Sequence, residues 1–291
     1  MKRISVLLLA LCLLVGCAAQ NPAPLQPTVR MPQRVVAASG SFAQIWQLAG
    51  GTLQGTTNDS FEDGFADPAL VEDVGGVHSP SLEKILALAP DLLLLSSDIP
   101  KQAALKEQLA AAGIFANYFS LETFEDYLAM LEFCTNFTGR SDLYQQNGLA
   151  VQAKIQKILQ QPHNTYVPKV LLVRVGAGRV TARGSNTMAG AMLKDLGCVN
   201  IADSDASLLE ELSLEVILRE DPNFIFATAM GNDTAKTQQI LQAALLGNPA
   251  WASLSAVRNN HYLMLPKALF HQKPNNRWDE AYQYLLDLLY G

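Results

Sequence analysis

Two stretches of the sequence, 132 residues apart, carry the same pattern. They read "SLEKILALAPDLLLL" at residues 81–95 and "SLEVILREDPNFIFA" at residues 213–227. Each predicts a short helix, then a turn, then a buried apolar strand. Glu83 and Glu215 stand at the same step of this unit. A chain that repeats one supersecondary unit nearly half its length later is expected to fold into two similar lobes.

Strand-like and helix-like segments alternate from residue 34 to the end of the chain. The apolar segments include "RVVAAS", "TLQGTT" and "DLLLLSS" in the first half and "KVLLVRVG", "NFIFATA" and "HYLMLP" in the second. Such alternation predicts mainly parallel sheets with helices on both faces. We therefore expect an α/β protein with two Rossmann-like lobes, at residues 33–140 and 164–291, and a ligand cleft between them.

A helix is predicted at residues 141–163, between the two lobes. Its sequence "SDLYQQNGLAVQAKIQKILQQ" has apolar residues at helical spacing and no proline before Pro162. Gly148 is the weak point, because glycine costs about 1 kcal/mol relative to alanine inside a helix. A helix of about 20 residues is about 30 Å long, roughly the width of a small domain. One long helix is therefore expected to join the lobes.

The N-terminus has the pattern of an export signal. Lys2 and Arg3 precede the apolar run "ISVLLLALCLLV", which is shorter than the about 20 residues of a membrane span. The run ends in "LVGC", which resembles a bacterial lipobox and makes Cys17 the expected lipidated residue. Residues 1–16 are then a lipoprotein signal peptide and residues 17–32 a flexible, proline-rich tether. The alternative is an ordinary secretion signal cleaved near "CAAQ".

The charge balance argues against nucleic acid as a partner. Removing Lys2 and Arg3 from the 21 basic residues leaves 19 against 27 acidic ones, a formal net charge of −8. Nucleic-acid binding normally calls for a basic domain with a basic patch. Cys134 and Cys198 are the cysteines that remain beyond Cys17. They are expected as buried thiols, with a disulfide between them as the alternative in an oxidising compartment.

The order of lipobox, tether, lobe, long helix and lobe resembles a known family. Together with "SPSLEKILALAPDLLLL", "LSLEVILREDPNFIFA" and "NPAWASLSAVRNNHYLMLP", it is similar to the substrate-binding lipoproteins of ABC importers for metal chelates. More narrowly, it resembles the helical-backbone class that binds ferric siderophores, haem or cobalamin. The resemblance covers essentially all of residues 33–291.

The resemblance carries expectations about ligand, partners and location. It implies a metal chelate as ligand, with an Fe(III)-siderophore preferred and haem or cobalamin as alternatives, and no further cofactor. It implies an ABC permease dimer in the membrane as partner. The protein is expected to be monomeric, extracytoplasmic and attached to the bacterial cell membrane through its lipid anchor only.

In this family an acidic residue on each lobe docks into arginines of the two permease subunits. The matching positions are Glu83 and Glu215. Exposed carboxylates on opposite lobes can steer and engage a two-fold partner. The alternative is that each carboxylate only stabilises the positive end of its own helix.

Ligands of open α/β sheets lie beyond the carboxyl ends of the strands, so these ends supply the expected ligand residues. From the first lobe they are Ser39, Ser41, Thr57 and His78; from the second they are Arg174, Arg179, Arg183, Lys267, His271, Lys273, Arg277 and Trp278. Six of these are cationic, in an otherwise acidic protein. Arginine forks and lysines suit an anionic chelate, and Arg179 and Arg183 are the first choices. The alternative is scattered, solvated charge, and Trp278 has the alternative of capping the last helix.

Two histidines, His78 and His271, fall in loops expected to border the cleft. Either could ligate a haem iron or bond a chelate oxygen, although a lone loop histidine is more often a polar contact. No direct metal site is predicted, because four histidines in all, two of them poorly placed, make a zinc or manganese site of three or four ligands a weak alternative.

An enzyme on two Rossmann-like lobes is the main alternative to a binding protein. The stretch "GAGRVT" begins like a dinucleotide-binding loop, but Thr181 stands where the third glycine is needed. No phosphate-binding loop, metalloprotease or nucleophile-elbow motif is present in the sequence. The chain is therefore not expected to be an enzyme.

Overall fold

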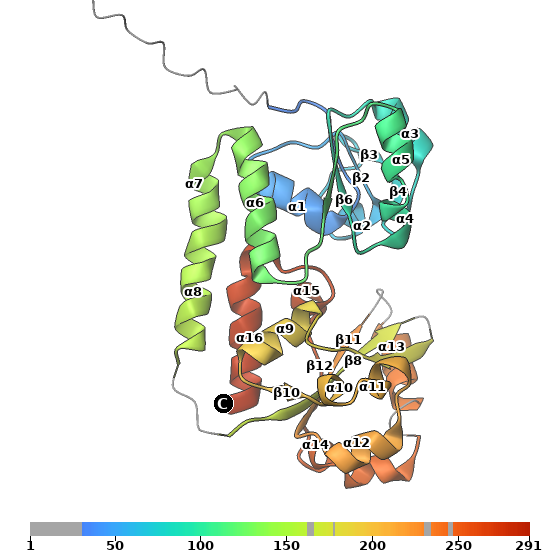
Figure 1. Ribbon diagram of the computed structural model, residues 1–291, viewed down its shortest axis with the longest axis vertical. Helices are drawn as coiled ribbons and strands as arrows, with labels where there is room; N and C mark the ends of the chain where they lie inside the picture. The colour runs from blue at the N-terminus through green and yellow to red at the C-terminus, as the bar shows by residue number, and fades with distance from the viewer. Residues whose placement is uncertain (1–30, 162–165, 177, 230–233, 244–246) are drawn as a thin grey trace, which may run out of the picture. The chain divides into compact units, whose positions relative to one another are not determined.

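The computed structural model describes residues 31–161, 166–176, 178–229, 234–243 and 247–291 (Figure 1). The expected signal peptide, Cys17 and most of the expected tether lie outside these residues. Residues 31–291 form one compact unit. Two parallel sheets lie in this unit, and we call the residues around each sheet the N-terminal lobe and the C-terminal lobe.

The N-terminal lobe is built on a sheet of five strands in the order β3-β2-β1-β6-β7, all parallel. A short antiparallel pair, β4 with β5, lies outside it. The elements are β1 (Val35–Ala37), α1 (Gly40–Leu48), β2 (Gly55–Thr56), α2 (Asn58–Glu62), β3 (Glu72–Asp73), β4 (Gly75–Gly76), β5 (Ser79–Pro80), α3 (Leu82–Leu88), β6 (Leu92–Ser96), α4 (Pro100–Ala103), α5 (Lys106–Ala111), β7 (Ala116–Phe119) and α6 (Phe124–Thr138).

The C-terminal lobe has parallel strands in the order β10-β8-β11-β12, with β9 antiparallel to β8. Its elements are β8 (Lys169–Gly176), β9 (Arg179–Ala182), α9 (Met188–Asp195), β10 (Val199–Asn200), α10 (Ile201–Ser204), α11 (Ser207–Glu210), α12 (Leu214–Glu220), β11 (Phe224–Ala229), α13 (Thr234–Leu241), the 3₁₀ turn η3 (Pro249–Ser253), α14 (Ser255–Arg258), β12 (Tyr262–Met264), α15 (Lys267–Phe270), the 3₁₀ turn η4 (Asn275–Arg277) and α16 (Trp278–Tyr290).

The continuous apolar run of β6 reflects a sheet that is covered on both faces. Leu92 and Leu94 point into one buried cluster, and Leu93 and Leu95 into another. All four side chains are fully buried. The α/β fold with mainly parallel sheets is therefore as the sequence predicts.

The repeated sequence unit folds the same way in both lobes. Helix α3 precedes β6, and α12 precedes β11, at the same offset of 132 residues. Ser81 and Ser213 cap the two helices, each accepting a hydrogen bond from the backbone N–H three residues later. Both helices end at a left-handed residue, Ala89 with φ 43° and Asp221 with φ 42°. The two units match down to their caps.

The predicted connecting helix is interrupted by a π-helical turn. It consists of α7 (Ser141–Tyr144), the π turn η1 (Gln145–Leu149) and α8 (Ala150–Leu159). A π turn displaces the regular hydrogen bonds of a helix. Here the Asn147 carbonyl accepts a bond from the buried Tyr127 hydroxyl at 2.8 Å. Gly148 lies in this turn, and a Cβ there would meet the Leu128 side chain at 3.0 Å, so glycine permits the close approach of α6.

A single buried apolar cluster reaches from one sheet to the other. It contains Val35 of β1, Leu92 of β6, Val170 of β8, Phe224 of β11 and Leu285 of α16. Figure 1 shows α8 and α16 side by side along this region. Separating the lobes completely would therefore expose apolar surface, at about 25 cal/mol per Å².

Cys134 and Cys198 are both buried and unpaired, so the disulfide alternative is not found. Burial raises the pKa of the Cys198 thiol to about 12 and also raises that of Cys134, which keeps both thiols protonated. Among the residues that the structure describes, no helix has the length and apolar character needed to cross a membrane.

Candidate ligand-binding site

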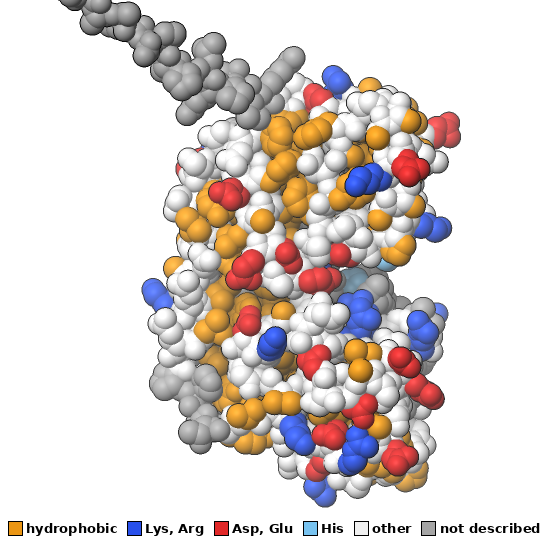
Figure 2. Space-filling model, in the orientation of Figure 1, with side chains coloured by type: hydrophobic (Ala, Val, Ile, Leu, Met, Phe, Trp, Pro, Cys, Tyr) orange, Lys and Arg blue, Asp and Glu red, His pale blue; other side chains and the backbone are white. Residues whose placement is uncertain are grey.

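One small cavity lies at the carboxyl ends of β8 and β11 in the C-terminal lobe, and Glu122, three residues after β7 ends, reaches it from the N-terminal lobe. It has a volume of about 40 Å³. Its charged or titratable lining residues are Glu122, Arg174, Arg183, His271 and Lys273. Figure 2 shows acidic side chains grouped where the two lobes meet, with basic and histidine side chains across from them. The geometry places the cationic residues where a parallel sheet normally holds its ligand.

Two arginines of the C-terminal lobe line the cavity side by side. Arg174 lies near the end of β8, and Arg183 directly follows β9. Arg183 is fixed by its backbone, because its N–H donates to Leu172 at 2.8 Å and its carbonyl accepts from Asn200 at 2.7 Å. Burial lowers the pKa of Arg174, and the Arg183 charge lowers it further. Within the described residues neither arginine has a carboxylate within salt-bridge distance, and the Arg183 Nε is buried without a hydrogen-bond partner.

Lys273 lies on a segment that crosses from the C-terminal lobe to the N-terminal lobe. Its backbone N–H donates to Ser41 Oγ at 3.3 Å. Two residues later, the Asn275 amide donates to the Ser41 carbonyl and to Gln44. Burial lowers the pKa of Lys273, and Glu122 opposes that effect. Ser41 is not among the residues that line the cavity, and its side chain and carbonyl anchor the crossing segment.

Glu122 brings the two lobes together inside the cavity. Its Oε1 pairs with Lys273 Nζ at 3.0 Å, and its Oε2 accepts a bond from the Met188 backbone N–H at 2.8 Å. Glu122 is not among the ligand residues expected from the sequence. The available signal was its position between the end of β7 and Thr123, which caps α6 in a capping box with Asp126.

His271 lines the same cavity and is half-buried. Burial lowers its pKa, and the charge of Lys267 lowers it further. Its Nδ1 is buried and has no hydrogen-bond partner within the described residues. Lys267 itself is half-buried at the first position of α15. A neutral imidazole at the wall of the cavity can accept a hydrogen bond or bind a metal ion.

A buried glutamine holds the strand ends of the N-terminal lobe together. Gln102 Nε2 donates to the carbonyls of Ala38 and Val77, each at 2.7 Å, and its Oε1 accepts from the Ser96 N–H at 2.7 Å. The side chain is fully buried. This network fixes the wall of the cleft that faces the C-terminal lobe.

Ser39 and Thr57 have local roles in that wall. Ser39 is half-buried at the start of α1. Thr57 is fully buried, and its hydroxyl donates to Asp59 Oδ1 at 2.6 Å. The other Asp59 oxygen accepts from the Gly40 N–H at 2.8 Å. Thr57 therefore orients Asp59, so its hydroxyl is not free for a ligand.

Eight of the twelve expected ligand residues are not among those that line the cavity: Ser39, Ser41, Thr57 and Lys267, described above, and Arg179, Arg277, Trp278 and His78. Arg179 is exposed on β9, because the sequence expected as a loop forms a hairpin turning at Gly178, with φ 78°. Arg277 is exposed and pairs with Glu280 at 2.7 Å. Trp278 is fully buried and packs against Phe124 with ring centroids 5.8 Å apart, because α16 turns its first residue into the core.

The last of the eight is His78. It is exposed in the two-residue connection between β4 and β5. The sequence placed it correctly in a loop before α3, but the structure gives it no contact with the cavity lining.

Glu83 and Glu215 are both exposed, at the second position of α3 and α12. A carboxylate there is favoured by the positive end of its helix. The same position also leaves both side chains free to meet a partner.

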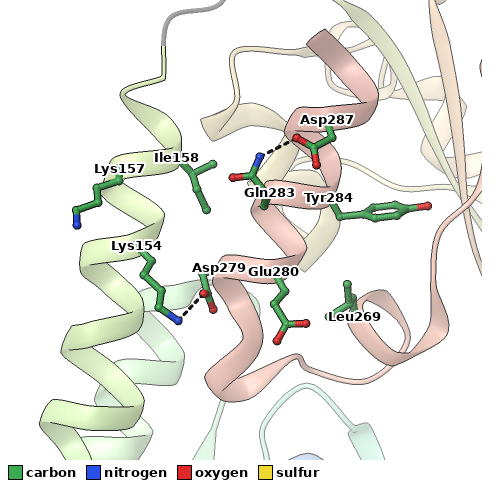
Figure 3. Close-up of a pocket in the computed structure, with 9 residues that line it drawn as sticks. All are labelled: Lys154, Lys157, Ile158, Leu269, Asp279, Glu280, Gln283, Tyr284 and Asp287. Atoms are coloured by element: carbon green, nitrogen blue, oxygen red, sulfur yellow. Dashed lines mark hydrogen bonds and ion pairs between the residues drawn. The ribbon is translucent and has the colours of Figure 1, made fainter. Parts of the chain in front are cut away.

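A larger groove of about 570 Å³ lies between α8 and α16 (Figure 3). Lys154 crosses it to pair with Asp279 at 2.9 Å, and Gln283 bonds to Asp287 within α16. The groove is lined mainly by faces of α8 and α16, and Asp279 and Glu280 in its lining are each paired with a cation. It lacks the converging strand ends of the smaller cavity, which is why we place the ligand site at the cavity.

No group of three or more histidine, cysteine, aspartate or glutamate residues suited to a metal ion occurs in the described part of the chain. A ligand held here would therefore be contacted by the cations and His271 of the cavity.

Comparison with known proteins places this geometry in a family. A sequence profile of the family described as "Periplasmic binding protein" matches residues 35–269. The iron-uptake system-binding protein of Bacillus subtilis is 26% identical over 219 residues, which cover 72% of this chain and 65%, slightly less than two thirds, of that protein. A vitamin B12-binding protein of Pectobacterium atrosepticum is 24% identical over 78% of this chain and 85% of its own length. The solved structure of S. aureus IsdE complexed with heme has a TM-score of 0.71 at 18% identity, over 89% of this chain and 99% of that one.

Proposed function

Because this chain belongs to the periplasmic binding protein family, we propose that it captures an anionic metal chelate outside the cytoplasm and delivers it to an ABC permease. It is a binding protein and not an enzyme. The ligand class is supported by relatives named for iron uptake and for vitamin B12 binding, and by a similar fold solved in complex with heme. The preferred ligand is an Fe(III)-siderophore.

One observation carries the choice of an anionic ligand. Arg174, Arg183 and Lys273 line one cavity at the strand ends, and among the described residues Glu122 is the one carboxylate in its lining. Arginine presents planar forks that match carboxylate and chelate oxygens, and such charge-assisted bonds are about twice as strong as neutral ones. The chain as a whole is acidic, with 27 acidic and 21 basic residues. An anionic ligand would balance the local excess of positive charge in this cavity.

Haem is the second candidate, and a specific residue favours it. His271 lines the cavity, and burial lowers its pKa, which keeps the imidazole neutral and able to ligate iron. The arginines would then pair with the carboxylates of the ligand. Cobalamin is the third chelate of this class.

Delivery to the permease would depend on two exposed glutamates and on the N-terminal cysteine. Glu83 and Glu215 would dock onto the two permease subunits. Cys17 would carry the lipid and hold the protein, as a monomer, at the bacterial cell membrane, with residues 17–32 as the tether. No other contact with the membrane is proposed.

The test is a ligand panel on purified protein lacking residues 1–16. Ferric siderophores, haemin and cobalamin are each added in a thermal unfolding experiment, and hits are titrated by calorimetry. A ligand at 100 times its Kd stabilises a protein by about 2.7 kcal/mol. We expect stabilisation by a ferric siderophore, with no chemical change in it.

Two outcomes would redirect the proposal. Stabilisation by zinc or manganese alone, with metal retained after dialysis, would favour direct metal binding. Turnover of any added compound would favour an enzyme.

A further inference from the structure

The Glu122 carboxylate is held in the way that a bound acidic ligand would be. One oxygen accepts from the ammonium of Lys273 at 3.0 Å, and the other from the backbone N–H of Met188, the first residue of α9, at 2.8 Å. A carboxylate with one cation and one backbone N–H is a complete anion-binding arrangement. Glu122 reaches it from the opposite lobe.

The cavity around Glu122 keeps an excess of positive charge. Arg174 and Arg183 line it as well, with no carboxylate in salt-bridge range among the described residues, and the Arg183 Nε is buried without a partner there. The side chains of Lys273 and Glu122 are only 22% and 32% exposed. Glu122 thus neutralises one of three cations at this place.

The cavity is too small for a chelate in this conformation. About 40 Å³ is far below the roughly 300–1,000 Å³ of a pocket that holds a small organic ligand. A chelate of ordinary size needs this cavity to widen, and the two bonds of Glu122 to Lys273 and Met188 are among the contacts that connect the lobes there. Once these two bonds are broken, the position taken by Glu122 becomes available.

We propose that Glu122 is an internal substitute for the acidic group of the ligand. It closes the cleft by binding Lys273 and the start of α9, and a carboxylate of the incoming chelate displaces it and takes over both bonds. This inference rests on the proposed function, and it adds a residue that sets specificity: a ligand without an acidic group leaves Lys273 and the Met188 N–H unpaired once Glu122 moves.

Chemical rescue with acetate tests this proposal without knowledge of the natural ligand. Glu122→Ala removes the atoms that acetate contains. Thermal unfolding of the variant is measured in sodium acetate and in sodium chloride at equal ionic strength. We expect acetate to raise the midpoint by about 2–4 °C over chloride, the shift that corresponds to about 1 kcal/mol in a chain of this size. Glu122→Ser is the second variant, with the same expected result, if the alanine variant does not fold.

Two controls place the effect at the cavity. Glu125→Ala changes an exposed acidic residue on the first turn of the same helix, α6, and should show equal midpoints in the two salts. The double variant Glu122→Ala/Lys273→Ala should lose the acetate effect. Equal midpoints in acetate and chloride for Glu122→Ala and Glu122→Ser would overturn the proposal, as would an acetate effect of the same size in Glu125→Ala.

The outcomes separate this inference from the proposed function. Acetate rescue combined with no response to any chelate of the panel would support the role of Glu122 as a carboxylate substitute and contradict the proposed ligand class. Chelate binding without acetate rescue would support the proposed ligand class and contradict the role of Glu122 as a carboxylate substitute.

Discussion

Glu83 and Glu215 occupy equivalent positions in two matching helices, each as the second residue after a capping serine and six residues before a left-handed residue that ends the helix. Both side chains are exposed. Two carboxylates presented in the same way by two lobes are the pattern that the proposed docking onto a two-fold permease requires, and each is also favoured by the positive end of its own helix.

The first prediction concerns these two residues. Changing both, Glu83→Lys and Glu215→Lys, should abolish or strongly reduce uptake of the ligand through the permease, because the two docking carboxylates become repulsive. The affinity of the isolated protein for its ligand should not change. Uptake of labelled ligand by cells and calorimetry on the purified variant are the two measurements.

A matched control is Glu107→Lys with Glu210→Lys, which makes the same charge change at exposed positions of both lobes. Normal transport by the Glu83→Lys/Glu215→Lys variant would contradict the docking role. Each carboxylate would then only stabilise the N-terminus of its own helix.

The second prediction concerns the anchor. Cys17→Ala should prevent labelling with fatty acid and release the protein from the membrane fraction. Fractionation of cells grown with a labelled fatty acid measures both. Continued labelling of the alanine variant would contradict the lipobox.

The third prediction concerns the buried network of the cleft wall. Gln102→Ala removes three hydrogen bonds that connect three strand ends, each of which contributes about 1 kcal/mol. The free energy of unfolding should fall by about 2–4 kcal/mol. Gln108→Ala, an exposed change on α5, should stay within about 0.5 kcal/mol of the parent in the same denaturant titration.

The fourth prediction concerns the pH dependence of stability. Burial and Lys267 lower the pKa of His271 in the folded protein, so the unfolded chain binds the proton more readily, at a pKa of about 6.5. The contribution of neutral His271 to stability is therefore complete above that pH and is lost as the pH falls toward the lower, folded value. Asp63, Arg174 and the Ala229 backbone also act on this pKa.

His271→Gln should accordingly lose less stability than the parent protein between pH 7.5 and 5.5, in unfolding titrations at several pH values. His78→Gln, which changes an exposed histidine, is the control. Identical pH profiles of parent and His271→Gln would contradict the assignment.

The sequence was sufficient for the sheet architecture, because apolar strands and helical segments alternate with clear turn signals. The structural repeat of α3–β6 in α12–β11 could be recognised as a repeated amino-acid pattern. The π turn at Gln145–Leu149 could not be predicted, since it depends on the Tyr127 hydroxyl and on how closely α6 approaches Gly148.

The structure brings four of the expected ligand residues together, and their contact with a ligand stays a prediction. Arg174, Arg183, His271 and Lys273 do line one cavity, because strand ends of parallel sheets converge. Arg179 does not, because its side of the β8–β9 hairpin faces solvent, and Trp278 is in the core. Glu122 was missed since its role depends on contacts with Lys273 and Met188, which are more than 60 residues away in the chain.

We propose that the cations of the cavity bind an anionic chelate. A comparison of Arg183, which lines the cavity, with the exposed Arg179 tests this most directly. Calorimetric titration with the chelate identified by the panel is carried out on Arg183→Ala and on Arg179→Ala. A charge-assisted bond in the cavity is worth about 1.5–3 kcal/mol, and each 1.4 kcal/mol is tenfold in Kd. The account predicts that Arg183→Ala weakens binding about tenfold or more, while the exposed Arg179→Ala changes it little. Parental affinity in Arg183→Ala, and likewise in Arg174→Ala, would contradict the account.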